Sequence, residues 1–150
     1  MPHPLLHFVC LFSTALALAP ATAHVMELPN KISLPKAEYQ VAQQLYRGWA
    51  LVGVIVVIAL VSNLTLALSL PTQQEPFVAA LIACLCIVGT QAIFWLVTFP
   101  INRRTKNWTV FPENWDELRK QWEYSHVASA VLNVVAFVAV ILAVLWSRNA

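Results

Sequence analysis

Four long apolar stretches alternate with short polar segments along the chain. The apolar stretches cover approximately residues 4–26, 49–70, 77–99 and 127–146, and none of them contains Lys, Arg, Asp or Glu. Each can form a helix that crosses the roughly 30 Å apolar core of a membrane, which takes about 20 residues. Lipid offers no partner to backbone polar groups, so segments of this kind are helices. The pattern predicts an all-α, integral membrane four-helix bundle that forms a single domain, residues 1–150.

The composition agrees with a membrane protein and excludes several other classes. Hydrophobic residues make up 59% of the chain and charged residues 11%, whereas a soluble domain carries about 25% charged residues. The chain is too apolar for a soluble globule or a disordered protein, and it carries too little charge for a nucleic-acid-binding protein. Its three cysteines do not form the dense pattern of a disulfide-stapled secreted domain. Membrane lipid is the expected surrounding, and nucleic acid is not an expected partner.

The positive charges are unevenly distributed between the connections, and this predicts an orientation. Eight of the nine Lys and Arg residues lie between spans one and two or between spans three and four, and Arg148 follows the last span. Connections rich in Lys and Arg stay in the cytoplasm. We therefore expect both termini on the non-cytoplasmic side, in a multi-pass protein of the plasma membrane, which is the inner membrane in a bacterium.

The first span also resembles a secretory signal peptide. Residues 5–19 form an apolar core, and Ala21-Thr22-Ala23 before His24 matches a small-residue cleavage site. A signal peptide begins with positive charge, yet only His3 and His7 stand near the start, without Lys or Arg. Cleavage would also place the eight basic residues outside, against the charge rule. We expect the first span to be retained as a helix.

Short helices are expected at the cytoplasmic surface. Pro29 and Pro35 are predicted to break the chain after span one, and Pro35 suits the first turn of a new helix. Val41 and Leu45 share an apolar face of that helix, near residues 36–46, which is typical of an interfacial helix.

The last connection carries a helix-start signature. Asn114 is followed three residues later by Glu117, the pattern that caps a helix. We expect one continuous helix from Trp115 into span four, with Asp116 and Lys120 paired at i,i+4.

Residues at helical spacing line one face in each of three spans, and the polar residues among them indicate that these faces point to the bundle interior. In span four they are Trp115, Leu118, Trp122, His126, Ser129 and Asn133; in span three Cys84, Val88, Gln91, Trp95 and Thr98; in span one the small-residue face Ser13, Ala17, Ala21 and His24.

Two His/Glu pairs stand at the cytoplasmic ends of spans one and four. His24-x-x-Glu27 and Glu123-x-x-His126 each place both side chains on one helical face. Together they could bind a single metal ion, or the two histidines could hold a haem, although no attachment motif is present. The alternatives are a proton-handling role and a structural charge network in which Glu123 bonds Arg119 one turn earlier.

The third connection and the start of span four carry a family resemblance. The stretches are Phe99-Pro100-Ile101-Asn102, Asn107-Trp108 and Trp115-x-x-Leu118-Arg119-x-x-Trp122-Glu123-x-x-His126. They resemble the anthrone oxygenase-like family of small four-helix membrane proteins, which is largely a domain of unknown function. The resemblance implies oxygenation of anthrones to anthraquinones without an added cofactor. The positions it marks are Asn102, Trp108, Trp115, Arg119, Trp122 and His126.

Three functions are consistent with these residues. The first is an oxygenase that oxidises a lipophilic aromatic or quinone-like substrate at the cytoplasmic leaflet. His126 would act as base, since its unperturbed pKa is near neutrality, and Glu123 and Arg119 would orient the site. The substrate would be held by Trp95, Asn102, Trp108, Trp115 and Trp122.

The second is a non-catalytic accessory or structural membrane protein, in which the tryptophans are interfacial anchors. The third is a small transporter, which needs a polar path from Asn63 through Gln91 and Asn133 to His126. Neither the oligomeric state nor a protein partner follows from the sequence.

Overall fold

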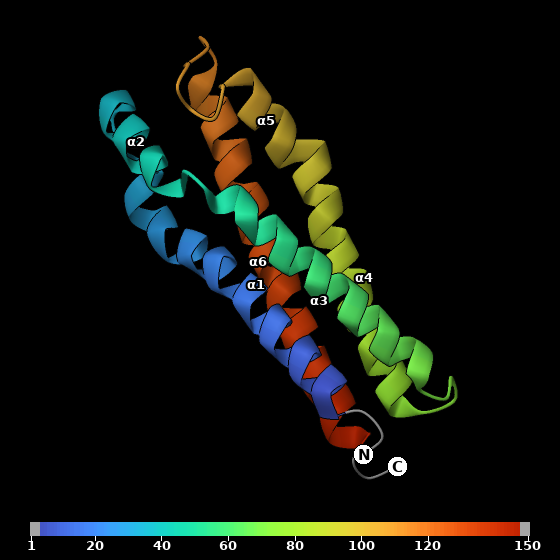
Figure 1. Ribbon diagram of the computed structural model, residues 1–150. Helices are drawn as coiled ribbons and strands as arrows, with labels where there is room; N and C mark the ends of the chain where they lie inside the picture. Colours follow the sequence, from blue (N-terminus) through green and yellow to red (C-terminus); the bar gives the residue numbers. More distant parts are fainter. Residues whose placement is uncertain (1–3, 148–150) are drawn as a thin grey trace.

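The computed structural model describes residues 4–147, which form helices and their connections (Figure 1). Four helical stretches are long and apolar enough to cross a membrane: Pro4–Lys31, Trp49–Ser69, Glu75–Arg104 and Trp115–Trp146. The predicted all-α fold, with four helices long and apolar enough to span a membrane, is therefore confirmed for the described part of the chain. His3, used above in the argument against cleavage, and Arg148, used to predict the orientation, lie outside the described residues.

The spanning stretches are built from several elements. In chain order these are α1 (Pro4–Lys31), α2 (Lys36–Gln43), η1 (Gln44–Tyr46), η2 (Trp49–Leu51), α3 (Val52–Ser69), α4 (Glu75–Ile93), the π-helical turn η3 (Phe94–Thr98), α5 (Phe99–Arg104) and α6 (Trp115–Trp146). The helix expected from Trp115 into span four is thus continuous. Asp116 and Lys120 form the expected i,i+4 pair, with 2.8 Å between Oδ2 and Nζ.

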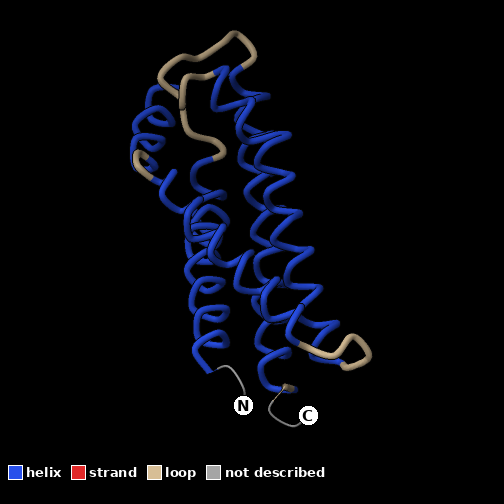
Figure 2. The backbone as a smooth tube through the Cα atoms, turned by 45° about the vertical axis from the view of Figure 1, so that its right-hand side comes forward, coloured by secondary structure: helices blue, strands red, loops and turns tan. Residues whose placement is uncertain are grey.

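The long helices form a four-membered bundle in which α1 and α6, the first and last helices, are neighbours. The helix α6 packs against α1 and α4, and α3 packs against the same two helices. The connections lie at the two ends of the bundle (Figure 2). The start of α1, the end of α6 and the α3–α4 turn share one end, which we call the terminal end. The helix α2 and the α5–α6 connection lie at the other, the loop end (Figure 1).

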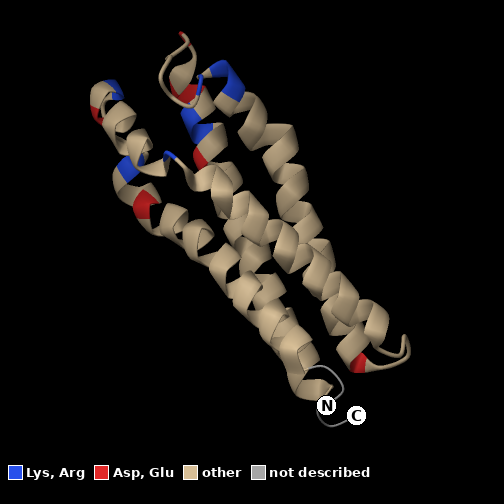
Figure 3. Ribbon diagram, viewed as in Figure 1, with Lys and Arg blue, Asp and Glu red and all other residues tan. Residues whose placement is uncertain are grey.

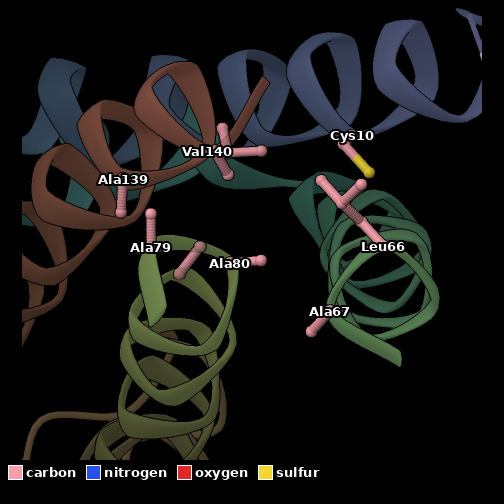
Figure 4. Close-up of a cluster of buried hydrophobic side chains, with 9 residues drawn as sticks. Cys10, Leu66, Ala67, Ala79, Ala80, Ala139 and Val140 are labelled. Carbon is pink, nitrogen blue, oxygen red and sulfur yellow. The ribbon is translucent and has the colours of Figure 1, made fainter. Parts of the chain in front are cut away.

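Small side chains let the helices approach closely in the terminal half of the bundle (Figure 4). The buried cluster there is formed by Cys10, Leu66, Ala67, Ala79, Ala80, Ala83, Ala139, Val140 and Ala143. Between membrane helices there is little hydrophobic driving force, so association depends on close van der Waals packing and interhelical hydrogen bonds. One such bond joins α3 to α1, where Nδ2 of Asn63 donates to Oγ1 of Thr14 at 3.0 Å. The expected small-residue face of α1 is buried throughout: Ser13, Ala17, Ala21 and His24.

The third span changes its winding before Pro100. Pro100 has no N–H, and its ring would clash with the carbonyl group four residues earlier in a regular α-helix. The π-helical turn Phe94–Thr98 precedes it, and α5 then begins at Phe99. One wider turn accommodates a proline without ending the helix. The span therefore continues to Arg104 and delivers Asn102 to the loop end.

Pro29 does not break the chain, contrary to the prediction. It lies inside α1, which continues to Lys31, and the backbone N–H of Ile32 still bonds the carbonyl of Leu28 at 3.0 Å. A proline this close to a helix end removes one hydrogen bond and leaves the following turn intact. The extra turn carries Lys31 to the bundle interior, where it is 4% exposed. Pro35 directly precedes α2, as expected.

The charged residues lie mainly at the loop end (Figure 3). At the terminal end the described residues include Glu75, in the first turn of α4. The two ends of the bundle thus differ strongly in polarity, and the loop end is where polar chemistry is concentrated.

Candidate functional site

A buried ion pair joins the end of α1 to α6 at the loop end. The Lys31 ammonium lies 3.2 Å from Oε1 of Glu123, and their side chains are 5% and 0% exposed. Tyr39, on α2, donates a hydrogen bond to the same Oε1 at 2.9 Å. Residues from α1 and α2, which are neighbours in sequence, therefore meet a carboxylate of the distant helix α6. A carboxylate buried this deeply requires such partners, because transfer of an isolated charge from water is very costly.

Lys31 also reaches a second carboxylate nearer the surface. Its Nζ is 3.4 Å from Oε2 of Glu27, whose side chain is 39% exposed, and it contacts the hydroxyl oxygen of Tyr46. The Tyr46 hydroxyl in turn donates to Glu27. Lys31 thus stands between an interior carboxylate and a half-exposed one. We call Glu27, Lys31, Tyr39, Tyr46 and Glu123 the charged cluster.

Two histidines stack beside the charged cluster. The rings of His24 and His126 are 4.0 Å apart between centroids, with their planes 16° from parallel. The edge-on ring of Trp122 lies 4.2 Å from His126, and Tyr46 lies 4.6 Å from His24. Nδ1 of His24 and Nε2 of His126 are buried without a hydrogen-bond partner. A neutral imidazole carries one acceptor nitrogen and one N–H group, so each of these two buried nitrogens leaves one hydrogen-bonding position unused.

An aromatic layer covers the charged cluster on the side of the α5–α6 connection. Tyr39, Trp108 and Trp122 are almost fully buried and pack with Ile101 and Leu118. The Trp108 ring lies 5.1 Å from Tyr39 and 5.9 Å from Trp122, edge to face in both cases, a favourable geometry for aromatic pairs. The layer excludes water from the charges beneath it, which strengthens their interactions.

Trp108 reaches this layer through an uncommon backbone turn. Lys106, Asn107 and Trp108 have φ angles of 47°, 54° and 61°, the left-handed region that residues other than glycine rarely adopt. The Thr105 hydroxyl supports the turn, since it accepts a hydrogen bond from the Trp108 backbone N–H at 3.1 Å. Strain of this kind is retained where surrounding contacts hold it, often at functional sites.

Asn102 and Arg119 hold the elements around the aromatic layer together. Oδ1 of Asn102 accepts a hydrogen bond from the indole N–H of Trp122 at 2.8 Å, joining α5 to α6. The Arg119 guanidinium donates to the Leu34 carbonyl at 2.7 Å and pairs with Asp116. The structural alternative above, in which Glu123 bonds Arg119, is therefore wrong. Lys31 and Tyr39 bond Glu123 instead, because α1 and α2 place them on its side of α6.

The hydroxyl groups of Tyr39 and Tyr46 stay protonated in this environment. Burial, followed by the negative charge of Glu123, raises the pKa of Tyr39 far above its ordinary value. Burial and the hydrogen bond to Glu27 raise the pKa of Tyr46 in the same way. Both phenols therefore act as hydrogen-bond donors to carboxylates.

The structure brings most of the predicted site residues together, with Trp95 as the exception. His24, Glu27, Asn102, Trp108, Trp115, Arg119, Trp122, Glu123 and His126 all lie at the loop end in or beside the contacts described above. The Trp95 side chain is 58% exposed and contacts Phe94 and Phe99 of its own span. The expected placement of Trp95 in the bundle interior is therefore wrong, and its side chain lies on the outer face of the span.

The two His/Glu pairs do not converge as metal ligands. Within residues 4–147 no three His, Cys, Asp or Glu side chains are placed to share one ion. Glu27 and Glu123 both point to Lys31 instead. The stacked rings of His24 and His126 leave no room for a porphyrin between them.

Lys31, Tyr39 and Tyr46 are central to the site but were missed from the sequence. Lys31 could have been found from its i,i+4 spacing to Glu27, because this spacing places it on the helical face of His24, one turn further along the helix. Nothing in the local pattern marks Tyr39, because its partner Glu123 is 84 residues away.

No protein-family model, curated protein or solved structure matches the chain.

Proposed function

We propose that the protein is a multi-pass membrane oxygenase of the anthrone oxygenase-like kind, which oxidises a lipophilic aromatic substrate with His126 as base. The observation that carries this proposal is the environment of His126. Its ring contacts both His24 and Trp122, which also contact each other, and its Nε2 is buried without a partner. A base beside flat aromatic side chains suits a flat aromatic acid, because proximity and orientation assist proton transfer.

The proposed reaction converts an activated methylene group to a ketone with molecular oxygen as oxidant. His126 removes one methylene proton, and the resulting carbanion adds O2 to form a peroxide. The peroxide takes up the proton and loses water, so one CH2 group and one O2 molecule give one C=O group and one water. Trp108, Trp115 and Trp122 would flank the rings, and Asn102 and Arg119 would fix the elements that carry them.

The proposed orientation places the loop end in the cytoplasm of a plasma membrane, or a bacterial inner membrane. Support comes from the concentration of basic residues at that end (Figure 3) and the positive-inside rule. A lipophilic substrate would then enter from the inner leaflet, where the charged cluster meets the apolar faces of the spans.

The test uses purified protein in lipid nanodiscs with anthrone and dissolved oxygen. We expect oxygen uptake and anthraquinone absorbance above empty nanodiscs, and a loss of about a hundredfold in His126→Gln, the scale of general base catalysis. His7→Gln, a buried histidine near the terminal end, is the matched control. Wild-type protein that oxidises no more anthrone than empty nanodiscs would overturn the proposal.

The alternative is a non-catalytic accessory or structural protein. The contacts that join α1, α2 and α6 through Glu123 favour this alternative. They would hold the helices together even in a protein that catalyses no reaction. Loss of stability in His126→Gln without any activity in the wild type would support this alternative.

A further inference from the structure

The charged cluster connects the interior of the bundle to its surface by consecutive polar contacts. Exposure rises along it, from the Glu123 side chain at 0% and Lys31 at 5% to Glu27 at 39%. Tyr46 contacts both Lys31 and Glu27. At the inner end, Glu123 lies one helical turn before His126 on the same face of α6, and its Oε2 is buried without a partner. Nε2 of His126 is likewise buried without a partner, so the unpaired carboxylate oxygen one helical turn away is the group expected to receive that base's proton.

We propose that Glu123, Lys31 and Glu27, with Tyr46, carry protons between His126 and solvent. The inference rests on the proposed function and adds to it the route by which the base exchanges its proton. A purely structural ion pair needs neither the free oxygen at its buried end nor a second carboxylate at the surface.

The transfer is balanced at every step. The imidazolium of His126 gives its proton to the Glu123 carboxylate. The Lys31 ammonium gives a proton to the Tyr46 hydroxyl, which passes its own proton to the Glu27 carboxylate, and the amine then takes the proton from Glu123. The net result is a neutral His126 and a protonated Glu27, which releases its proton to solvent. Lys31 and Glu123 end as they began.

Hydrogen–deuterium exchange of anthrone without oxygen tests this route separately from oxidation. In D2O the proton removed by His126 either returns to carbon or is replaced by a deuteron through the route, and NMR or mass spectrometry of anthrone measures the replacement. Wild-type protein in nanodiscs should accelerate the exchange. We expect Glu27→Gln and Tyr46→Phe to slow it about tenfold or more, with Glu27→Asp closer to the wild type. Glu113→Gln, an exposed position before α6, is the matched control and should exchange as the wild type does.

Two further measurements separate proton transfer from structural damage. Quenching of tryptophan fluorescence by anthrone should give an unchanged affinity in Glu27→Gln. Formate, a small proton carrier, should restore exchange in that variant, whereas a misfolded site would not respond to it. Normal exchange in Glu27→Gln and Tyr46→Phe, or slow exchange that formate leaves unchanged, would overturn the route. Wild-type protein that neither exchanges nor oxidises anthrone would instead refute the proposed function.

Discussion

Replacing Lys31 by Met tests how strongly the charged cluster stabilises the bundle. Methionine keeps most of the side-chain length and removes the ammonium, so Glu123 keeps Tyr39 as its recorded partner. The Glu123 side chain is 0% exposed and cannot regain water. Breaking a buried ion pair by removing one partner costs about 3–5 kcal/mol, because the remaining charge is left buried. We expect the free energy of unfolding to fall by this amount.

The matched control removes a similar ammonium from an exposed pair. Lys120 and Asp116 lie 2.8 Å apart, but their side chains are 57% and 44% exposed. Exposed pairs of this kind contribute little to stability, because water and salt screen the two charges. Lys120→Met should therefore leave the free energy of unfolding nearly unchanged.

The assay is titration of the detergent-solubilised protein with SDS, followed by tryptophan fluorescence. Combining Lys31→Met with Glu123→Gln should restore most of the stability, because the second change removes the charge that the first leaves unpaired. Equal losses in Lys31→Met and Lys120→Met would refute the reasoning, since they would show that burial does not distinguish the two pairs.

Three smaller predictions concern single contacts, and the same unfolding assay measures them. Thr14→Val keeps the volume of the side chain but removes the bond from Asn63, and should cost about 0.6 kcal/mol, the average for interhelical hydrogen bonds in a membrane bundle; a loss as large as that in Lys31→Met would contradict this. Lys106 is exposed and has a φ of 47°, so Lys106→Gly should preserve stability or raise it by up to about 1 kcal/mol, and Lys106→Val should lower it; the opposite order would show that the turn is unstrained. Because burial and the Glu27 hydrogen bond raise the pKa of Tyr46 above its ordinary value of 10.0, the unfolded chain loses this proton first as pH rises. The contribution of Tyr46 to the free energy of unfolding should be constant below pH about 10 and fall above it. In Tyr46→Phe the free energy of unfolding should decrease less steeply over that pH range.

Hydrophobic length and helical spacing were sufficient to predict the architecture. The four spans follow from lipid's inability to satisfy backbone polar groups. The small-residue face of α1 from Ser13 to His24 is buried as its spacing indicated, because only small side chains allow close contact between membrane helices. The start of α6 at Trp115 also follows from a local pattern.

The partners within the site depend on contacts between distant segments and could not be predicted. Local spacing offered Arg119 as the partner of Glu123, but the end of α1 brings Lys31 there instead. Trp95 was assigned to the interior by extending a polar stripe along span three, and Val88 of that stripe is also exposed. Cys84 of the stripe is buried, but the buried face of α4 also carries Ala80, Ala83 and Ile87, so interhelical packing rather than polarity alone decides which side of the helix faces the bundle.

Because the first helix, α1, packs against the last helix, α6, the bundle can close only after the whole chain has been synthesised. The contacts that close the loop end join residues 84 and 85 positions apart, Tyr39 to Glu123 and Leu34 to Arg119. A growing chain therefore inserts its first three spans before Glu123 of α6, which pairs with Lys31, has been synthesised. Spanning helices are stable individually in lipid and associate afterwards. The last helix to leave the ribosome thus completes the bundle, and in a chain truncated before α6 Lys31 would lack its interior carboxylate.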